Sequence, residues 1–261
     1  MNSVDLNHQS GFVYGRAAAA PPIGERIDAL VNDALLAERD IAPPRDYLGA
    51  SRIGEPCARR LCYELMDVPV DEGAALSGRM LRIFEAGHRF EEMTIRWLRL
   101  AGFDLRTHNC KGEQFGFSVA GGRFRGHIDG VIVDGPDISI EYPLLFEHKA
   151  VRSSSWQDIV KRGVHASKPI YWAQVQIYMA YLEVERTLFV ALDKDRQALR
   201  FELVLLDPSA AQALSDKAVA VIRAVEAGEP LPRISDHPEF YICTFCPYRI
   251  RCHALAVGGD A

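Results

Sequence analysis

Two acidic residues and a lysine in the middle of the sequence have the types and the spacing that metal-assisted chemistry requires. Glu147 and Lys149 lie two positions apart in the stretch FEHK, directly after an apolar run, and Asp129 lies in the earlier stretch GHIDG. Residues two positions apart on a strand share a face, so we expect Glu147 and Lys149 to point one way and His148 the other. If the two strands pair, Asp129 and Glu147 converge.

A divalent cation would relieve the repulsion between these two acids. Two carboxylates at close range do not both ionise readily, and one stays protonated unless a cation lies nearby. Mg²⁺ or Mn²⁺ binds a few carboxylate oxygens together with water and phosphate oxygens. Such an ion can generate a hydroxide nucleophile and stabilise the charge that develops on a phosphate. Lys149 would then orient or help deprotonate the attacking water and offset phosphate charge.

A third carboxylate lies on a predicted helix upstream, which runs from about Arg79 to Ala101. The predicted buried stripe of this helix consists of Met80, Phe84, Gly87, Thr94 and Leu98. Glu91 lies in the middle of that stripe, Glu92 lies outside it, and His88 lies at its edge. A carboxylate on a buried stripe is costly unless it is paired or bound to a metal. The alternative to a metal ligand is a salt bridge to an arginine of the core.

Regular elements are predicted on both sides of these residues. Helices are expected at 23–40, 57–66, 79–101, 171–184 and 208–230, and strands at 123–133, 142–151, 187–193 and 199–206. The Pro- and Gly-rich stretch 42–56 is expected to be a loop. This order of helices and strands favours an α/β fold in which a mixed sheet carries helices on both faces.

The pair of motifs GHIDG and FEHK resembles the PD-(D/E)XK nuclease superfamily. The resemblance makes Asp129 the first acid, Glu147 and Lys149 the second half of the motif, and the backbone carbonyl of His148 a further metal ligand. It implies a restriction-endonuclease-like mixed central sheet flanked by helices, over about residues 50–253. It also implies a metal-dependent DNA exonuclease acting on single-stranded ends, in recombination, replication, repair or CRISPR adaptation.

Two further motifs are similar to those of the RecB-like branch of this superfamily. Upstream, GHRFE resembles the motif that supplies an extra metal ligand, and its register implies Glu91, with His88 as a second candidate because that branch more often places histidine there. Downstream, QVQIY resembles the Q-x-x-x-Y motif. Gln174 and Tyr178 share a helical face and would contact the substrate or brace the active site. A pair on a helix flank without a catalytic role is the alternative.

Three cysteines near the C-terminus, Cys243, Cys246 and Cys252, are spaced C-x2-C-x5-C. A zinc ribbon needs two close pairs, so a fourth thiolate must come from far away, and Cys57 is the best candidate. RecB-like nucleases with an iron–sulfur cluster carry one upstream and three downstream cysteines with this spacing. The resemblance therefore implies a [4Fe–4S] cluster, with zinc as the alternative occupant. Cys62 is a spare thiol that could substitute, and Cys110 is expected to be a small buried residue.

Cationic and aromatic side chains lie close in sequence to these cysteines. They are Arg59, Arg60, Tyr248, Arg249 and Arg251. Such residues suit phosphate contacts and base stacking on a single strand of DNA, although a solvated surface is an equal alternative. Lys161, Arg162, His165 and Lys168 are weaker candidates, in an expected loop before the Q-x-x-x-Y helix.

Composition and charge exclude several classes of protein. A net charge of −5 argues against a strongly basic nucleic-acid coat protein. The sequence has neither an apolar run long enough to cross a membrane nor a secretory signal, so we expect a cytoplasmic protein. In that compartment six cysteines favour metal binding or catalysis over disulfides.

The predicted organisation is one nuclease domain at 51–255 with cluster-binding ends. It is preceded by a disordered stretch at 1–22 and by a helix and linker at 23–50, and it is followed by a tail at 256–261. The expected partners are DNA and proteins of recombination or CRISPR adaptation, with no membrane. Two rival hypotheses are a catalytically silent DNA-binding or assembly module of the same fold and a zinc-containing endonuclease.

Overall fold

The computed structural model describes residues 21–41 and 45–254. Residues 1–20 of the stretch predicted to be disordered, 1–22, and the expected tail at 256–261 lie outside the described residues. Among the described residues, no helix is long and apolar enough to cross a membrane.

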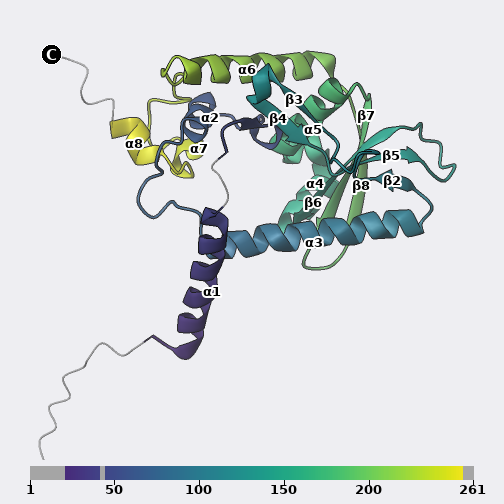
Figure 1. Cartoon of the computed structure of the whole chain (residues 1–261), viewed down its shortest axis with the longest axis horizontal. Helices are drawn as coiled ribbons and strands as arrows, with labels where there is room; N and C mark the ends of the chain where they lie inside the picture. The colour runs from purple at the N-terminus through teal and green to yellow at the C-terminus, as the bar shows by residue number, and fades with distance from the viewer. Residues whose placement is uncertain (1–20, 42–44, 255–261) are drawn as a thin grey trace, which may run out of the picture.

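A five-stranded sheet forms the centre of the molecule (Figure 1). Its order is β2 (Asp104–Arg106), β5 (Gly130–Asp134), β6 (Leu144–Val151), β7 (Arg186–Asp193) and β8 (Leu199–Leu205). Strands β6 and β7 are parallel, and every other neighbouring pair is antiparallel. The predicted hairpin of β7 and β8 is confirmed. Parallel neighbours need a long crossover, and α4 (Ser153–Ser167) and α5 (Pro169–Leu182) supply it.

The two faces of β6 belong to two different hydrophobic cores. Leu144 and Phe146 pack with Ile95 and Leu98 of α3 (Gly78–Leu100) on one face. Leu145 and Val151, on the other face, pack with residues of α4 and α5. Alternation along one strand therefore places α3 on one side of the sheet and the crossover helices on the other. The predicted mixed sheet with helices on both faces is confirmed.

A smaller sheet consists of β1 (Leu48–Gly49), β4 (Phe124–His127) and β3 (Gly116–Val119). The sequence predicted one strand over 123–133, but the structure divides this stretch into β4 of the small sheet and β5 of the large one. Ile128 and Asp129 form the link between them. The stretch 42–56 was predicted to be a loop, yet it contains β1, which pairs in parallel with β4, and a 3-10 helix at Ala50–Arg52.

Further helices complete the described part of the chain. They are α1 (Ile23–Asp40), α2 (Ala58–Leu65), α6 (Pro208–Glu226), α7 (Tyr241–Thr244) and α8 (Arg249–Ala254). In Figure 1, α6 lies along one side of the body, and α7 and α8 lie beside α2. Helix α5 is buried at every position from Ala173 to Met179, as expected of a helix that is apolar on all sides. Helix α4 was predicted to be a loop, so Lys161, Arg162 and His165 lie on a helix instead.

Helix α3 begins and ends within one residue of the prediction, but its buried stripe is shorter. Thr94 and Leu98 are buried, whereas Met80 is 38% exposed and Phe84 is 48% exposed. The described contacts of α3 with the sheet involve β2 and β6, and the buried residues of the helix, apart from Gly78 at its start, lie at 94–98. The N-terminal half of α3 therefore keeps apolar side chains at the surface.

Candidate active site

Asp129 and the β6 motif lie side by side because β5 pairs antiparallel with β6. Gly130 is opposite Phe146 in the register, so the residue before β5 lies next to Glu147 and His148. The backbone N–H of His148 donates a 2.8 Å hydrogen bond to Asp129 Oδ2. The predicted convergence of Asp129 and Glu147 is therefore present in the structure.

Glu147 lies at the centre of a small network of polar side chains. Lys149 Nζ lies 2.5 Å from Glu147 Oε1, and Gln174 Nε2 donates a 2.8 Å hydrogen bond to the same oxygen. Gln174 also lies 3.2 Å from the hydroxyl of Tyr178. The other oxygen, Glu147 Oε2, is buried and has no hydrogen-bond partner among the described residues. A buried carboxylate oxygen without a partner is costly.

His148 points to the opposite face of β6, as the alternation predicts. Its Nε2 lies 3.2 Å from Thr94 Oγ1 on α3. Burial, together with the charge of Lys149, lowers the pKa of His148 to about 4, so the imidazole is neutral near pH 7. Its side chain joins α3 to β6. The structure assigns no contact to its backbone carbonyl, whose role as a metal ligand stays a prediction.

Three acids in the site hold their protons unusually tightly. Burial and the negative charge of Asp129 raise the pKa of Glu147 to about 8. The same two causes raise the pKa of Glu91 to about 7, and burial raises the pKa of Asp129. Lys149 behaves in the opposite sense: burial would lower its pKa, but the carboxylates of Glu147 and Asp129 raise it. The site thus has one firmly charged cation among acids that repel one another.

Of the upstream candidates, Glu91 is the least exposed of those for which an ion pair is described. Its side chain is 23% exposed, and its charge contributes to the raised pKa of Glu147. His88 is 77% exposed, with Nδ1 3.8 Å from Glu91 Oε2, so it lies at the margin. Glu92 pairs with Arg89 at the surface. The alternative of a core salt bridge for Glu91 is not seen among the described residues.

The side chains as they stand do not form a finished metal site. Within residues 21–41 and 45–254, no three His, Cys, Asp or Glu side chains are grouped closely enough to hold an ion. The chemistry of the donor set nevertheless fits Mg²⁺ or Mn²⁺, since both take carboxylate oxygens. Among the described residues Glu147 Oε2 has no hydrogen-bond partner, and a divalent cation would relieve the mutual repulsion of the acids.

Two neighbours of the site were not predicted from the sequence. The ring centroid of Tyr171 lies 5.5 Å from Lys149 Nζ, and Thr94 contacts His148. Tyr171 lies three positions before Gln174 and seven before Tyr178, so helical spacing could have placed it on the same face. Thr94 could not have been paired with His148, because that contact depends on how α3 crosses the sheet.

The four cysteines predicted to act together line one small cavity. Cys57 lies at the start of α2, Cys243 on α7, Cys246 between α7 and α8, and Cys252 on α8. The cavity volume is about 20 Å³. Burial and the nearby Cys57 and Cys252 thiols raise the pKa of Cys243. Cys62 is fully buried and does not line the cavity. Cys110 was predicted to be buried and is exposed, because it lies in the turn between β2 and β3.

The proposed DNA-contacting residues near the cysteines are mostly engaged in internal contacts. Arg59 Nε donates to the Leu231 carbonyl at 2.6 Å, and Arg60 pairs with Glu55 and Glu64 at 3.1 Å. Tyr248 is 5% exposed and packs edge-on against Tyr63, so base stacking on its ring is not supported.

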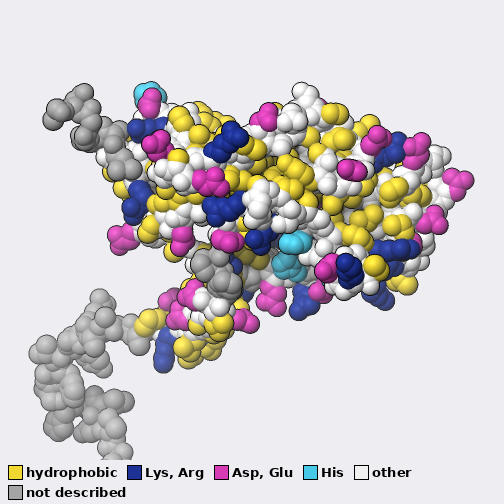
Figure 2. All heavy atoms as spheres, turned by 45° about the horizontal axis from the view of Figure 1, so that its top comes forward, with side chains coloured by type: hydrophobic (Ala, Val, Ile, Leu, Met, Phe, Trp, Pro, Cys, Tyr) yellow, Lys and Arg dark blue, Asp and Glu magenta, His cyan; other side chains and the backbone are white. Residues whose placement is uncertain are grey.

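The outer arginines near the cysteines are more accessible. Arg251 is exposed, although its Nε also donates to the Pro69 carbonyl, and Arg249 lies 4.0 Å from Glu239. On the face shown in Figure 2, basic and acidic side chains are interspersed. Among the five predicted DNA contacts, Arg249 and Arg251 are therefore the better placed.

Known structures share this architecture, although no protein-family model and no curated protein matches the chain. The crystal structure of an alkaline exonuclease (LHK-Exo) from Laribacter hongkongensis matches with a TM-score of 0.50, covering 77% of this chain and 93% of that one at 17% identity. LHK-Exo in complex with dAMP matches with a TM-score of 0.50, covering 75% and 93% at 18% identity. The chain therefore has a fold similar to that of an alkaline exonuclease, in agreement with the predicted nuclease fold.

Proposed function

We propose that this protein is a divalent-metal-dependent nuclease that hydrolyses phosphodiester bonds of DNA. The observation that carries the proposal is the meeting of Asp129 with Glu147 and Lys149 on β6, where Glu147 Oε2 is buried without a hydrogen-bond partner among the described residues. The fold shared with an alkaline exonuclease supports the same conclusion.

In this proposal the acids hold the ion and the lysine faces the phosphate. Asp129, Glu147 Oε2 and Glu91 would ligate Mg²⁺ or Mn²⁺, with His88 at the margin. A bound ion supplies an activated water and offsets charge on the phosphate. Because its pKa is raised, Lys149 stays protonated and acts as a fixed cation. Gln174 holds Glu147 Oε1 in place, and Tyr178 in turn contacts Gln174.

Cleavage of labelled single-stranded DNA tests the proposal. We expect hydrolysis with Mg²⁺ or Mn²⁺ and none with EDTA. Glu147→Ala and Lys149→Ala should each lower the rate at least 100-fold, within the range for loss of a group that acts in proton transfer or charge stabilisation. Glu92→Ala is the matched control, because Glu92 is exposed and pairs with Arg89.

The contrary result would favour the silent module. If the protein shows no metal-dependent cleavage, a DNA-binding or assembly module without nuclease activity is favoured. If both variants cleave as fast as the parent, cleavage does not depend on Glu147 and Lys149, and the proposed active site is wrong. Substrates blocked at the 5′ or the 3′ end test the finer proposal of an exonuclease that starts from single-stranded ends. Cleavage of substrates blocked at both ends would indicate an endonuclease instead.

We also propose that the four cysteines bind one metal centre, a [4Fe–4S] cluster, with zinc as the alternative. The shared cavity of Cys57, Cys243, Cys246 and Cys252 supports a common site, and thiolates suit both occupants. A volume of about 20 Å³ is small for a cluster, so residues 243–252 would have to move outward to admit one. Iron, sulfide and zinc contents of anaerobically purified protein decide between the two.

A further inference from the structure

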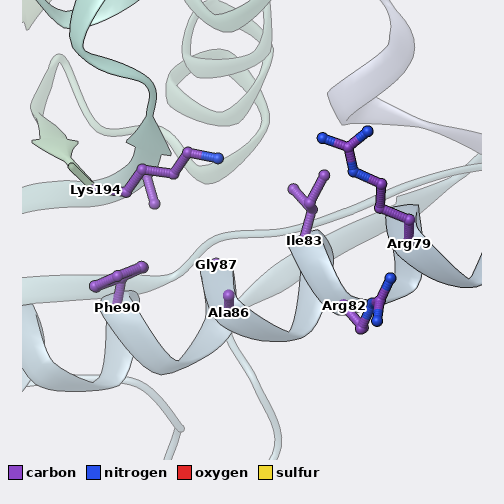
Figure 3. Close-up of a pocket in the computed structure, with 8 residues that line it drawn as sticks. Arg79, Arg82, Ile83, Ala86, Gly87, Phe90 and Lys194 are labelled. Atoms are coloured by element: carbon purple, nitrogen blue, oxygen red, sulfur yellow. The ribbon is translucent and has the colours of Figure 1, made fainter. Parts of the chain in front are cut away.

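A basic groove runs along the N-terminal half of α3, next to the candidate active site. It has a volume of about 300 Å³ and lies between α3 and the end of β6. The lining residues are Arg79, Arg82, Ile83, Ala86, Gly87, Phe90, Ala150 and Lys194. Figure 3 shows Arg79 and Ile83 projecting from α3 toward the side on which Lys194 lies.

The charge of this groove is opposite to that of the whole chain. Three of the eight lining residues are cations and none is an acid, although the chain carries a net charge of −5. Arg82 is paired with Asp28 of α1 at 2.8 Å. None of the described ion pairs or side-chain hydrogen bonds involves the side chain of Arg79 or of Lys194. The walls between these two cations are apolar, with Ile83 and Phe90 as the largest side chains. A ligand with anionic groups joined by apolar parts fits such a surface.

The groove is fixed in position relative to the catalytic strand. The backbone N–H of Lys194 donates a 3.0 Å hydrogen bond to the carbonyl of Val151, two residues after Lys149. The same turn is held by Asp193, whose two carboxylate oxygens each accept from Ser153 Oγ at 2.8 Å. On the other wall, Gly87 lies one helical turn before Glu91. Ala150 lies on the α3 face of β6, opposite to Glu147 and Lys149, and the charge of Glu91 interacts with those of Asp129 and Lys149. A strand that passes from the acids over Glu91 and along α3 would therefore reach the groove.

We propose that this groove binds the phosphate backbone of the single strand whose scissile bond lies at Asp129 and Glu147. Arg79 and Lys194 contact phosphates, and Phe90 and Ile83 contact sugars or bases. The inference rests on the proposed nuclease function, and it adds a binding site to it. The helical rise of 1.5 Å per residue puts Arg79 about 18 Å from Glu91 along α3. At about 3.4 Å per nucleotide, the rise of a strand stacked as in the duplex, that distance corresponds to about five nucleotides, and a more extended strand spans it with fewer.

Binding of a fluorescent 16-nucleotide single strand, as a function of salt, tests the groove. Ca²⁺ replaces Mg²⁺, and a gel confirms that the oligonucleotide stays intact. The double variant Arg79→Gln/Lys194→Gln should bind on the order of ten-fold more weakly at low salt. The slope of log association constant against log salt concentration should be shallower by about 1.4 for this variant, because each phosphate contact on a single strand contributes about 0.7 to that slope. Arg82 is left unchanged, since its pairing with Asp28 holds α1.

Two further variants test whether the charge and the open volume of this groove matter, as distinct from the loss of any two surface cations. Arg200→Gln/Lys111→Gln removes the same kinds of charge at exposed positions away from the groove and should keep the parent affinity and slope. Gly87→Leu fills the groove without changing charge. A Cβ at Gly87 meets no atom within 4 Å, so this variant should fold normally and bind the strand more weakly.

Cleavage kinetics give an independent readout of the same groove. On the 16-mer the double variant should raise KM about ten-fold with kcat unchanged, and on a dinucleotide it should equal the parent, because a dinucleotide does not reach Arg79. Equal affinity and salt slope in the parent and the double variant would overturn the proposal. So would competition by millimolar inorganic phosphate, which would make the groove a site for free anions. If the strand binds through the groove but is not cut, the groove stands and the nuclease function fails.

Discussion

At the scale of single residues, Gln174 determines which oxygen of Glu147 is free. Gln174 Nε2 and Lys149 Nζ both contact Oε1, and among the described residues Oε2 has no hydrogen-bond partner. A side chain that orients a ligating carboxylate commonly changes metal affinity or activity by 10- to 100-fold when it is removed.

The first prediction concerns this orienting contact. Gln174→Leu should lower the cleavage rate about 10- to 100-fold and raise the Mg²⁺ concentration needed for half-maximal activity, because Glu147 can then rotate. Gln176→Leu is the matched control on the same helix. Gln176 is buried but bonds the Leu205 carbonyl and the Asp207 N–H, so its loss should lower the melting temperature and leave the metal requirement unchanged. The same change in metal requirement in both variants would contradict the role of Gln174.

The second prediction concerns pH and the buried acid. The pKa of Glu147 is about 8 in the folded protein, above its ordinary value of 4.5. Such a group contributes stability while it is protonated, and the contribution is lost as pH rises toward 8. The melting temperature of the metal-free protein should therefore fall by several degrees between pH 5 and pH 8.5. Mg²⁺ should reduce the fall, because the ion compensates the charge of the ionised acid.

The variants sharpen this test. Glu147→Gln should show a smaller fall in melting temperature over the same pH range, since an amide has no charge to bury. Glu92→Gln should behave like the parent, because Glu92 is exposed beside Arg89. Parallel pH profiles for the parent and Glu147→Gln would show that this acid does not determine the pH dependence.

The sequence was enough to predict which face of its strand or helix each site residue occupies. It was not enough to predict the contacts between residues of different elements. The period of a strand was enough to place Glu147 and Lys149 on one face and His148 on the other, as the structure has them. Helical spacing was enough to bring Gln174 to Tyr178. The bond between Gln174 and Glu147 joins residues of different elements, so it depends on packing that one element's pattern does not contain. The prediction that Tyr248 stacks on DNA bases was wrong for the same reason. Its ring is buried against Tyr63, and that tertiary contact cannot be read from the pattern of one element.

At the scale of elements, a glycine lets the small sheet approach α5. A Cβ at Gly126 of β4 would lie 2.4 Å from the Tyr178 ring and 2.7 Å from the Ala50 Cβ. Both are closer than such atoms approach one another. The small sheet therefore packs directly against the helix that carries the Q-x-x-x-Y motif, and only a residue without a side chain fits between them.

The third prediction follows from this close approach. Gly126→Ala should lower the free energy of unfolding by about 1–3 kcal/mol, the usual cost of overpacking, and should reduce cleavage through displacement of Tyr178. Gly24→Ala is the control, because a Cβ there meets nothing within 4 Å and alanine favours the helix. Denaturant unfolding measures both variants. A Gly126→Ala protein as stable as the parent would show that the two layers separate easily.

The elements were predicted well where a pattern was long, and poorly where the chain changes partners. Helix α3 was placed within one residue, yet its exposed N-terminal half was assigned to the core, because periodicity does not tell how far the sheet extends. The stretch 123–133 was predicted to be one continuous strand because its residues alternate through Asp129, where the structure separates β4 from β5. Helix α4 was missed because its polar residues read as a loop, and a helix break at Gly163, with φ of 74°, interrupts its pattern.

At the scale of the whole molecule, the cysteine cavity joins parts of the chain that are far apart in sequence. Cys57 begins α2, and Cys252 lies on the last described helix, so one centre at this cavity would close nearly the whole fold. The two segments already touch without it: the Arg251 N–H and the Ile250 N–H donate to the Asp71 carboxylate at 3.1 and 2.7 Å. A centre that closes so long a loop reduces the entropy of the unfolded chain and thereby stabilises the fold.

The fourth prediction tests this closure. Cys252→Ser should lose the bound metal, and its melting temperature should fall by several degrees, because residues 243–254 then lose their tie to α2. Cys110→Ser is the matched control, since Cys110 is exposed and far from the cavity in the sequence; it should keep the metal content and the melting temperature of the parent. Metal analysis and thermal unfolding of the three proteins, prepared without oxygen, measure both effects. If Cys252→Ser keeps its metal, the cavity is not the metal site. If the variant loses the metal but keeps its melting temperature, the hydrogen bonds to Asp71 already hold the C-terminal segment. A metal centre there would then serve a purpose other than closing the fold.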